Sequence, residues 1–355
     1  MIAGLFFLTV FFIHSFSSGQ PASQTNASPH ITSRTMTEAS GGIPYCYKVA
    51  FTDPDGPLDT AVYSRYPSWL MVEADSLYGV PPPGAKDTTF LVIISDGLHA
   101  DTARVAIAVN PTIIVYGDSR TNAKVHRRII GLIVRQKPQT VFHTGDLVED
   151  GNRSSDWETF NAITSAMRAE SEFYPALGNH EHQSPLFFSD FELPNNEQWY
   201  SVNRNRIHFI VLNSCVPTDT SSKQYHWLEA DLARISDSTK FIAAVFHHPP
   251  FSSGSHREDE KGLRQTLVPL FERYGVAIVF NGHDHSYERL QCDSIYYIVT
   301  GGGGAPLSGR ERVHPCSKVF RKIHHYCKVS RVDDRMIVRV FDIDSQLIDQ
   351  FEITR

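Results

Sequence analysis

The sequence predicts an α/β fold with a small all-β sandwich domain ahead of it, and two patterns support this prediction. Between residues 113 and 280, apolar strands alternate with helical stretches, which is the order of elements in an α/β sheet protein. Between residues 45 and 109, short apolar runs are separated by turn signals about every 10–15 residues, without a helical period. Residues 295–299 and 335–341 are strands with no helix between them, which predicts an additional antiparallel portion.

Length and composition exclude several broad classes of protein. The chain has 355 residues, of which 39 are acidic and 33 basic, so its formal net charge is −6. That length suggests two domains, and a hydrophobic content of 41% excludes wholesale disorder. A mildly acidic chain without a run of five Lys or Arg residues argues against nucleic-acid binding and against a polybasic membrane patch. The 17 histidines are about twice the usual number, which favours metal binding.

The beginning of the chain resembles a targeting segment. Residues 1–19 contain an apolar stretch at 2–13, which is the length of a signal-peptide core and too short to span a bilayer. We therefore expect a secreted protein, extracellular or periplasmic, with no membrane span after cleavage. An uncleaved anchor is the alternative, because no Lys or Arg precedes the apolar run. Residues 20–40 are rich in Ser, Thr, Ala and Pro, which predicts a flexible leader.

Residues 41–110 are the predicted β-sandwich, with strands at 90–94 and 104–109. The order of its turns resembles that of cadherin-like, immunoglobulin-type modules of extracellular proteins. This resemblance implies a role in spacing or adhesion. Asp53, Asp55 and Asp96 are candidate calcium ligands of such a module, and turn formation is the alternative reading.

Residues 111–355 are the predicted catalytic domain. Strands are expected at 113–116, 140–143, 173–177, 207–212, 241–246 and 276–280. Helices are expected at 125–135, 157–169, 225–235 and 263–274. Ser154 or Ser155 is the expected N-cap of the second helix.

Cysteine usage is compatible with an oxidising compartment. The five cysteines allow up to two disulfides, and Cys316 with Cys327 closes the shortest candidate loop. None lies in a Cys-x-x-Cys pattern, which argues against a zinc-thiolate site.

Polar residues of the metal-binding kinds follow five of the predicted strands. The carboxyl ends of strands in an open α/β sheet form the edge where ligands bind. A mixed set of carboxylate, amide and imidazole donors suits Zn, Mn or Fe better than Ca or Mg. Two such ions about 3.5–4 Å apart bind a phosphate and activate a water. Six donors are about right for two ions that share one carboxylate; they are Asp118, Asp146, Asn179, His247, His283 and His285.

The motifs that contain these residues are GD, GD, GNHE, HxP and GHxH, in that order over residues 112–308. They resemble the motifs of the calcineurin-like metallophosphoesterase superfamily and, within it, of the purple-acid-phosphatase-like branch. The resemblance implies a β-sandwich flanked by helices, an α/β/β/α architecture. It also implies hydrolysis of phosphate esters at a dinuclear centre, by attack of a metal-bound hydroxide on phosphorus.

The same resemblance implies a role for each donor. Asp146 would bridge the two ions, and Asp118 and His285 would belong to one of them. The other ion would be completed by Asn179, His247 and His283. Of the adjacent pair His247 and His248, the first is the expected ligand because it opens the HxP pattern.

Two positions depart from the family pattern. Arg120 stands where the family has Gly or His, two residues after Asp118, and Glu149 stands where purple acid phosphatases have Tyr. Loss of that Tyr predicts a protein without purple colour. Glu149 or His126 is a candidate to complete the first metal site, with a surface or helix-face role as the alternative. Arg120 is a candidate to grip a phosphate oxygen, with a loop salt bridge as the alternative.

Two histidines complete the catalytic candidates. His180 resembles the family residue that positions or protonates the substrate oxygens. His256 resembles the family's loop histidine near the leaving group, where it would act as general acid; an exposed loop residue is the alternative.

The sequence therefore predicts a secreted phosphoesterase with two Zn, Mn or Fe ions that acts on a small phosphomonoester. A phosphodiesterase with the same centre is the first alternative. The second is a non-catalytic surface protein that binds through its β-module, which the changes at Arg120 and Glu149 favour. The sequence leaves the oligomeric state open.

Overall fold

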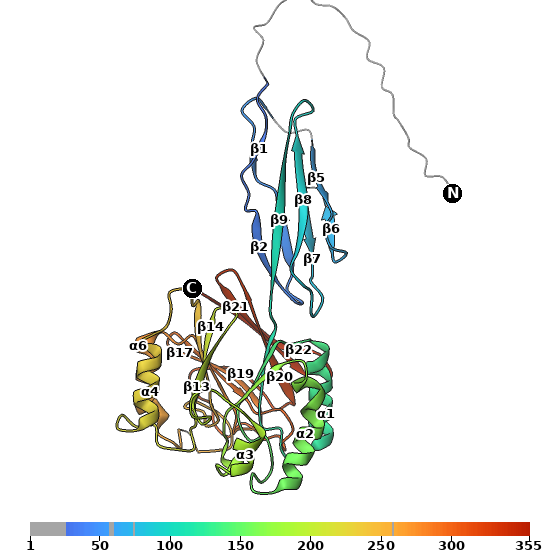
Figure 1. The fold of residues 1–355 in the computed structure, drawn as a ribbon. Coiled ribbons are helices and arrows are strands. Elements are labelled where there is room, and N and C mark those ends of the chain that lie inside the picture. The colour runs from blue at the N-terminus through green and yellow to red at the C-terminus, as the bar shows by residue number, and fades with distance from the viewer. Residues whose placement is uncertain (1–25, 57–59, 74, 258) are drawn as a thin grey trace, which may run out of the picture.

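The computed structural model describes residues 26–56, 60–73, 75–257 and 259–355, in two parts joined end to end (Figure 1). The predicted signal peptide, 1–19, and the first residues of the predicted leader lie outside the described residues. Across the described ranges, the helices are all too short or too polar to cross a membrane.

The N-terminal module, residues 30–110, is all-β, as the turn pattern predicts. It contains a four-stranded sheet in the order β2-β9-β8-β5, a three-stranded sheet in the order β3-β7-β6, and the β1-β4 pair. Alternate residues of β8 are buried, and Phe90, Val92 and Val105 are at the centre of a separate hydrophobic core. The described strands are β1 (His30–Ile31), β2 (Met36–Ser40), β3 (Tyr45–Lys48), β4 (Phe51–Thr52), β5 (Thr60–Ser64), β6 (Leu70–Glu73), β7 (Ser76–Gly79), β8 (Thr88–Ser95) and β9 (Ala100–Asn110).

The predicted flexible leader is wrong for residues 30–40, because β1 and β2 lie there. β2 pairs in parallel with β9, and its Ala39 and Ser40 are buried. The small residues of β2 resemble a linker in composition. The pairing partner, more than sixty residues later in the chain, is what orders them.

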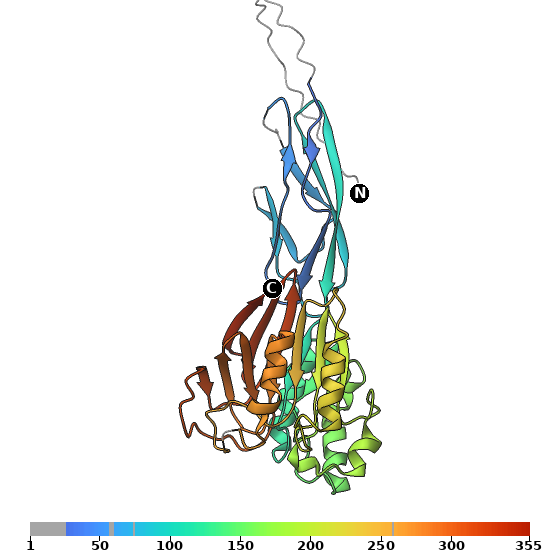
Figure 2. The same ribbon diagram turned by 90° about the vertical axis from the view of Figure 1, so that its left-hand side faces the viewer.

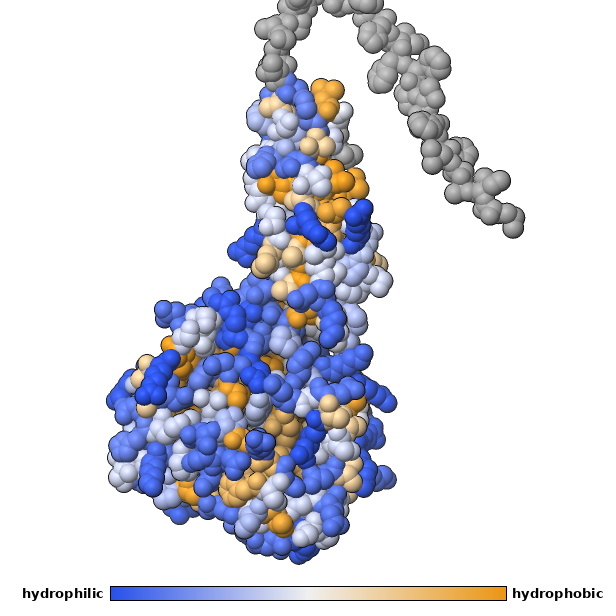
Figure 3. Space-filling model, viewed as in Figure 1, coloured by the Kyte–Doolittle hydropathy of each residue, from blue (hydrophilic) through white to orange (hydrophobic). Residues whose placement is uncertain are grey.

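Apolar side chains are exposed along one side of the module (Figure 3). On β5 and β6, the exposed large hydrophobic side chains are Val62, Met71 and Val72, at 50%, 54% and 43% exposure. The resemblance of this module to cadherin-like domains remains a prediction.

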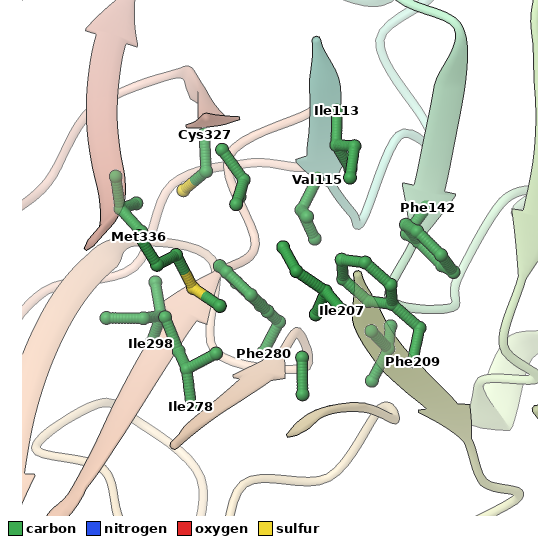
Figure 4. Close-up of a cluster of buried hydrophobic side chains, with 14 of the residues drawn as sticks. Ile113, Val115, Phe142, Ile207, Phe209, Ile278, Phe280, Ile298, Cys327 and Met336 are labelled. Carbon is green, nitrogen blue, oxygen red and sulfur yellow. The ribbon is translucent and has the colours of Figure 1, made fainter. Parts of the chain in front are cut away.

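The α/β part contains two sheets packed face to face. The six-stranded sheet has the order β12-β11-β10-β20-β21-β22, and the seven-stranded sheet has the order β13-β14-β15-β16-β18-β17-β19. Side chains from both sheets, such as Val115, Phe142, Phe209 and Phe280, form the buried layer between them (Figure 4). The strands are β10 (Ile113–Tyr116), β11 (Thr140–His143), β12 (Glu172–Pro175), β13 (Tyr200–Arg204), β14 (Ile207–Val211), β15 (Phe241–Val245), β16 (Ile278–Asn281), β17 (Tyr287–Cys292), β18 (Ile295–Thr300), β19 (Ser317–Arg321), β20 (His325–Val332), β21 (Arg335–Asp342) and β22 (Leu347–Thr354).

Helices cover the outer faces of both sheets (Figures 1 and 2). α1 (Ala123–Arg135) and α2 (Ser154–Arg168) pack on the six-stranded sheet through Ile129, Ile133 and Met167. α4 (Lys223–Leu232), α5 (Leu263–Thr266) and α6 (Val268–Tyr274) pack on the other sheet. A short 3₁₀ turn (Asn179–Glu181) and α3 (Pro185–Asp190) follow β12. The predicted α/β/β/α architecture is confirmed, and β20, β21 and β22 form the expected antiparallel portion.

Two helix predictions need correction. The single helix expected over 263–274 is divided into α5 and α6, because Pro269 lacks the N–H that would bond to the preceding turn. Helix α2 begins at Ser154 with Arg153 as its N-cap, so neither Ser154 nor Ser155 caps it.

The predicted Cys316–Cys327 pairing is also wrong. Cys292 at the end of β17 is bonded to Cys316, with their Cα atoms 5.2 Å apart. The Gln291 N–H donates to the Cys316 carbonyl, so the two cysteines meet across neighbouring backbones. Cys327 faces the buried layer between the sheets, away from Cys316. The short separation of these two cysteines in the sequence gives no information about this orientation.

A buried ion pair joins the two parts. Arg331 of β20 is 3% exposed, and its guanidinium donates to both carboxylate oxygens of Glu38 in β2, at 2.7 and 3.1 Å. Glu38 also accepts hydrogen bonds from Asn110 and from the backbone of Asp333. This network anchors β2 and the end of β9 to the α/β part.

We expect Glu38→Ala to lower the free energy of unfolding by about 2 kcal/mol, because it leaves a buried guanidinium without its carboxylate. Chemical denaturation measures the change. The matched control is Glu352→Ala, whose partner Arg335 is 44% exposed, and which should cost below about 0.5 kcal/mol. Equal losses in the two variants would contradict the prediction.

Candidate metal centre

All six predicted donors lie together at the carboxyl ends of the strands. Asp118 follows β10, Asp146 follows β11, Asn179 follows β12, and His247 follows β15. His283 and His285 follow β16. Asp118, Asp146 and His283 have left-handed backbone conformations, with φ of 54°, 57° and 69°. This strained backbone turns the side chains toward a common point.

Glycines in the same loops allow this close approach. A Cβ added to Gly282 would overlap Oδ2 of Asp118, and one added to Gly178 would overlap Oδ1 of Asp146. Gly145 has φ of 96°, and its Cβ would lie 2.9 Å from Nδ1 of His247. The glycines of the motifs therefore leave the space that the donors occupy.

We call Asp146, Asn179, His247 and His283 the second donor set. Nε2 of His247 lies 3.0 Å from Oδ1 of Asn179, 3.2 Å from Nδ1 of His283 and 3.3 Å from Oδ1 of Asp146. Nδ1 of His247 lies 3.0 Å from the carbonyl oxygen of Thr144, which places the ring proton on Nδ1. Nε2 therefore presents a lone pair to the other donors, an arrangement that a bound cation stabilises.

We call Asp118, Asp146 and His285 the first donor set. Nε2 of His285 lies 3.6 Å from Oδ1 of Asp118, while its Nδ1 lies 2.8 Å from the carbonyl oxygen of Pro306. The orienting hydrogen bond thus leaves Nε2 directed toward the carboxylate. Both sets contain the oxygen and nitrogen donors that transition metals bind, and Asp146 is common to them.

The pKa shifts of His247, His285 and Asp146 have the directions that metal binding requires, whereas that of Asp118 is opposite in the metal-free protein. Burial lowers the pKa of His247 and lowers that of His285 to about 4. Burial and the nearby Asp146 raise the pKa of Asp118. Burial opposes ionisation of Asp146 as well, but His247 and His180 hold its pKa below the ordinary value. Neutral imidazoles and an ionised carboxylate are the states in which these side chains bind metal.

Arg120 lies within the first donor set. Its Nε lies 3.2 Å from Oδ2 of Asp146, and its Nη2 lies 3.4 Å from Nε2 of His285. Its Nη1 donates to Glu149 at 2.9 Å. Glu149 therefore faces Arg120 and Thr121 rather than the other donors.

The structure places His126 away from the donors, on the buried face of α1. Its Nε2 lies 3.4 Å from the Tyr116 hydroxyl, and its ring stacks on Phe160. This position corresponds to the helix-face alternative.

His180 and His256 border the centre on different sides. The backbone N–H of His180 donates to Oδ1 of Asp146 at 3.1 Å, and its Nδ1 lies 2.6 Å from the carbonyl oxygen of Glu149. The His256 ring stacks on that of His283, with centroids 3.8 Å apart. Both histidines are thus held in fixed positions beside the donors.

Three acidic residues near the centre were not predicted. Buried Glu181 accepts the backbone N–H groups of Asp146, Leu147 and Gly178, and so holds the Asp146 loop. Asp284 accepts a hydrogen bond from Nδ1 of His256 at 2.9 Å and raises the pKa of that histidine. Glu181 lies within the GNHE motif and Asp284 within the GHDH motif, and this proximity to the predicted donors is the sequence signal that could have identified them.

The third is Glu260, whose carboxylate oxygens lie 3.4 Å from Nε2 of His248 and 3.5 Å from Nε2 of His283. His248 is buried with Nδ1 2.8 Å from the Ser214 hydroxyl. Its imidazole is therefore directed to Glu260 and Ser214, whereas His247 is the one against Asp146.

The motifs and the fold both have counterparts among known proteins. The model of the calcineurin-like phosphoesterase family matches residues 100–287. Purple acid phosphatase 13 from Arabidopsis thaliana is 39% identical over 165 residues, which cover 41% of this chain and 30% of that protein. Purple acid phosphatase 15 from the same plant is 30% identical over 171 residues, covering 41% and 32%. The chain thus matches about a third of the length of these relatives.

A solved structure resembles most of the fold. The purple acid phosphatase PPD1 from yellow lupin (Lupinus luteus) seeds has a TM-score of 0.63 and 16% identity, covering 89% of this chain and 70% of that chain. At this identity the likeness concerns the fold. It extends beyond the α/β part, because 89% of the chain includes residues of the N-terminal module.

Proposed function

This chain belongs to the calcineurin-like phosphoesterase family, and we propose that it is a secreted phosphatase that hydrolyses small phosphomonoesters at a metal centre. The observation that carries the proposal is the convergence of donor atoms on Nε2 of His247, within 3.3 Å of Asn179, His283 and Asp146. Purple acid phosphatases have a dinuclear centre, and the two donor sets that share Asp146 would hold two ions.

Zn, Mn or Fe ions, when bound, neutralise phosphate oxygens and lower the pKa of water at the centre. The protein's part is to hold the donors in place. Glu181 fixes the Asp146 loop through backbone N–H groups, and Thr144 fixes the imidazole of His247. Such orienting contacts spare the donors from rearranging when a substrate binds.

Two further side chains are placed to bind the substrate's phosphate. Arg120 provides a permanent positive charge beside Asp146, and a guanidinium pairs well with phosphate oxygens. His180 is held through Nδ1 by a carbonyl, so its Nε2 is the nitrogen that would position or protonate a phosphate oxygen. Several donors for non-bridging oxygens favour a terminal phosphate, which has three of them, over a diester.

His256 is the proposed proton donor to the leaving alcohol. Asp284 accepts from its Nδ1, which leaves Nε2 as the nitrogen that would donate to the leaving oxygen. Ser252 donates to the other oxygen of Asp284 at 2.5 Å and fixes that carboxylate. The ring is 39% exposed, so a substrate has access to it.

Secretion is supported by the Cys292–Cys316 disulfide, since such bonds persist in oxidising compartments. The predicted signal peptide agrees with this location.

Metal content and hydrolysis of two model substrates test the proposed function. We expect the purified protein to contain transition metal and to hydrolyse p-nitrophenyl phosphate at least about tenfold faster than bis-p-nitrophenyl phosphate, by kcat/KM. Chelation should remove the activity, and Zn, Mn or Fe should restore it. Faster hydrolysis of the diester would replace the proposal by a phosphodiesterase. Absence of turnover with every metal would leave the non-catalytic alternative.

A further inference from the structure

The first donor set already contains a cation that belongs to the protein. The three nitrogens of the Arg120 guanidinium group contact four side chains: Asp146 at 3.2 Å, His285 at 3.4 Å, Glu149 at 2.9 Å and Thr121 at 3.3 Å. The side chain is only 14% exposed. Arg120 is therefore packed among the donors, in contact with the two atoms, Oδ2 of Asp146 and Nε2 of His285, that a metal ion would need.

The second donor set differs in this respect. Oδ1 of Asp146, Oδ1 of Asn179 and the ring nitrogens of two histidines face one another across about 3 Å. Within the described ranges, no Lys or Arg nitrogen contacts these atoms. The two sets share Asp146, and the guanidinium lies on the Oδ2 side of that carboxylate, among the side chains of the first set.

We infer that Arg120 is an internal competitor for one of the two metal positions. The second donor set binds the first ion tightly, and a further ion enters the first donor set only by displacing the guanidinium. This inference rests on the proposed metal centre and concerns the order and affinity of its loading.

Displacement has a cost because of the charge of Arg120. A guanidinium stays protonated at all physiological pH values, so its contacts with Asp146 and Glu149 are charge-assisted hydrogen bonds. An incoming ion must break the contact with Asp146, and it is repelled by the guanidinium until that group moves away. Both effects weaken binding more at the first donor set than at the second, because the second set meets the guanidinium only through the shared Asp146.

The structure also has a place for the displaced side chain. A pocket of about 230 Å³ lies next to Arg120 between α1 and α2, and it is lined by Glu149 and Asp156 among others. Glu149 contacts both Arg120 and Thr121 at the pocket's edge. Arg120 can therefore keep its contact with Glu149 as it leaves Asp146, so the guanidinium stays beside the centre, where it can still bind a phosphate oxygen.

The test is calorimetric titration of the metal-free protein with Zn²⁺ alone, and with Mn²⁺ alone. We expect two binding steps in the wild type whose dissociation constants differ by about 100-fold or more. In Arg120→Ala the weaker step should tighten by about tenfold or more, while the tighter step changes by less than about threefold. Arg120→Gln, which keeps hydrogen-bond donors without the charge, should tighten the weaker step as well.

The matched control is Arg128→Ala, which removes an exposed arginine of α1 paired with Asp344 and should leave both steps unchanged. Circular dichroism confirms the fold of each variant. Two equal steps in the wild type, or a weaker step that neither Arg120 variant tightens, would overturn the inference and leave the proposed function intact. A wild-type protein that binds neither ion would overturn both.

Discussion

Asp146→Asn is expected to abolish phosphatase activity and to deplete the protein of metal. Asp146 is the only side chain that belongs to both donor sets, through Oδ1 toward His247 and Oδ2 toward Arg120. An amide supplies one neutral oxygen where two ions need a charged bridge. We expect kcat/KM for p-nitrophenyl phosphate to fall by at least about 100-fold, with bound metal per chain reduced in parallel.

The fold should tolerate this change. Asn keeps the oxygen that accepts the N–H of His180, and the loop remains anchored because Glu181 binds the backbone of residue 146 rather than its side chain. Removing one carboxylate also relieves the repulsion that raises the pKa of Asp118. The variant loses the contact between Arg120 and Oδ2 of Asp146, so the midpoint of thermal unfolding of the metal-free variant should fall by only about 2–4 °C from that of the metal-free wild type.

The control for Asp146→Asn is Asp344→Asn, a change at an exposed carboxylate on the surface. It should leave both turnover and metal content at the wild-type level. Full metal content together with full turnover in Asp146→Asn would contradict the assignment of the shared donor.

Gly282→Ala is the second change with a large expected effect. The added Cβ would overlap Oδ2 of Asp118 and lie 2.8 Å from Oγ1 of Thr144 and 3.2 Å from Nδ1 of His247. One methyl group thus displaces members of both donor sets. We expect kcat/KM to fall by about 100-fold and the free energy of unfolding to fall by about 1–3 kcal/mol.

Gly131→Ala is the matched control for that substitution. Gly131 lies within α1, and a Cβ there meets no atom within 4 Å. Alanine in a helix is favoured over glycine, so this variant should gain about 0.5–1 kcal/mol of stability and keep its activity. Turnover assays and chemical denaturation of both variants measure these effects. Wild-type activity in Gly282→Ala would contradict the prediction, because it would show that the loop accommodates the added Cβ.

The donor residues could be predicted from sequence because each follows a strand directly. Asp118, Asp146 and His247 come within two or three residues of the ends of buried strands, so the fold itself brings them to one edge. The strands are short, apolar and bounded by glycine, which makes their ends easy to identify. Element types were therefore predicted well, and the boundaries differ by a few residues, as at α1 and α2.

Features that depend on distant pairing were not predictable in this way. β2 is ordered by β9, and Cys292 meets Cys316 because of how β17 lies beside the loop before β19. A composition rule for linkers or a shortest-loop rule for disulfides contains no information about such neighbours. The same holds for Asp284 and His256, which are 28 residues apart and touch through a loop that passes over the centre.

Arg120 shows the limit of motif reading most clearly. The sequence marks it as a departure from the family pattern and leaves its role open between a phosphate contact and a salt bridge. Only the three-dimensional structure shows that its nitrogens contact Asp146, His285 and Glu149 together. The direction of a side chain depends on its packing in three dimensions, and the residues next to it in the sequence do not determine it.

The connection between β9 and β10 has a mechanical consequence. Only Pro111 and Thr112 separate the two strands at the junction of the two parts (Figure 1), and the ion pair between Arg331 and Glu38 anchors the same junction. The short connection and the ion pair therefore hold the module in a fixed orientation against the α/β part. β10 starts at this junction and ends beside Asp118, so the candidate metal centre lies at the end of β10 that is distant from the module. A partner that binds the module would therefore leave the candidate metal centre accessible.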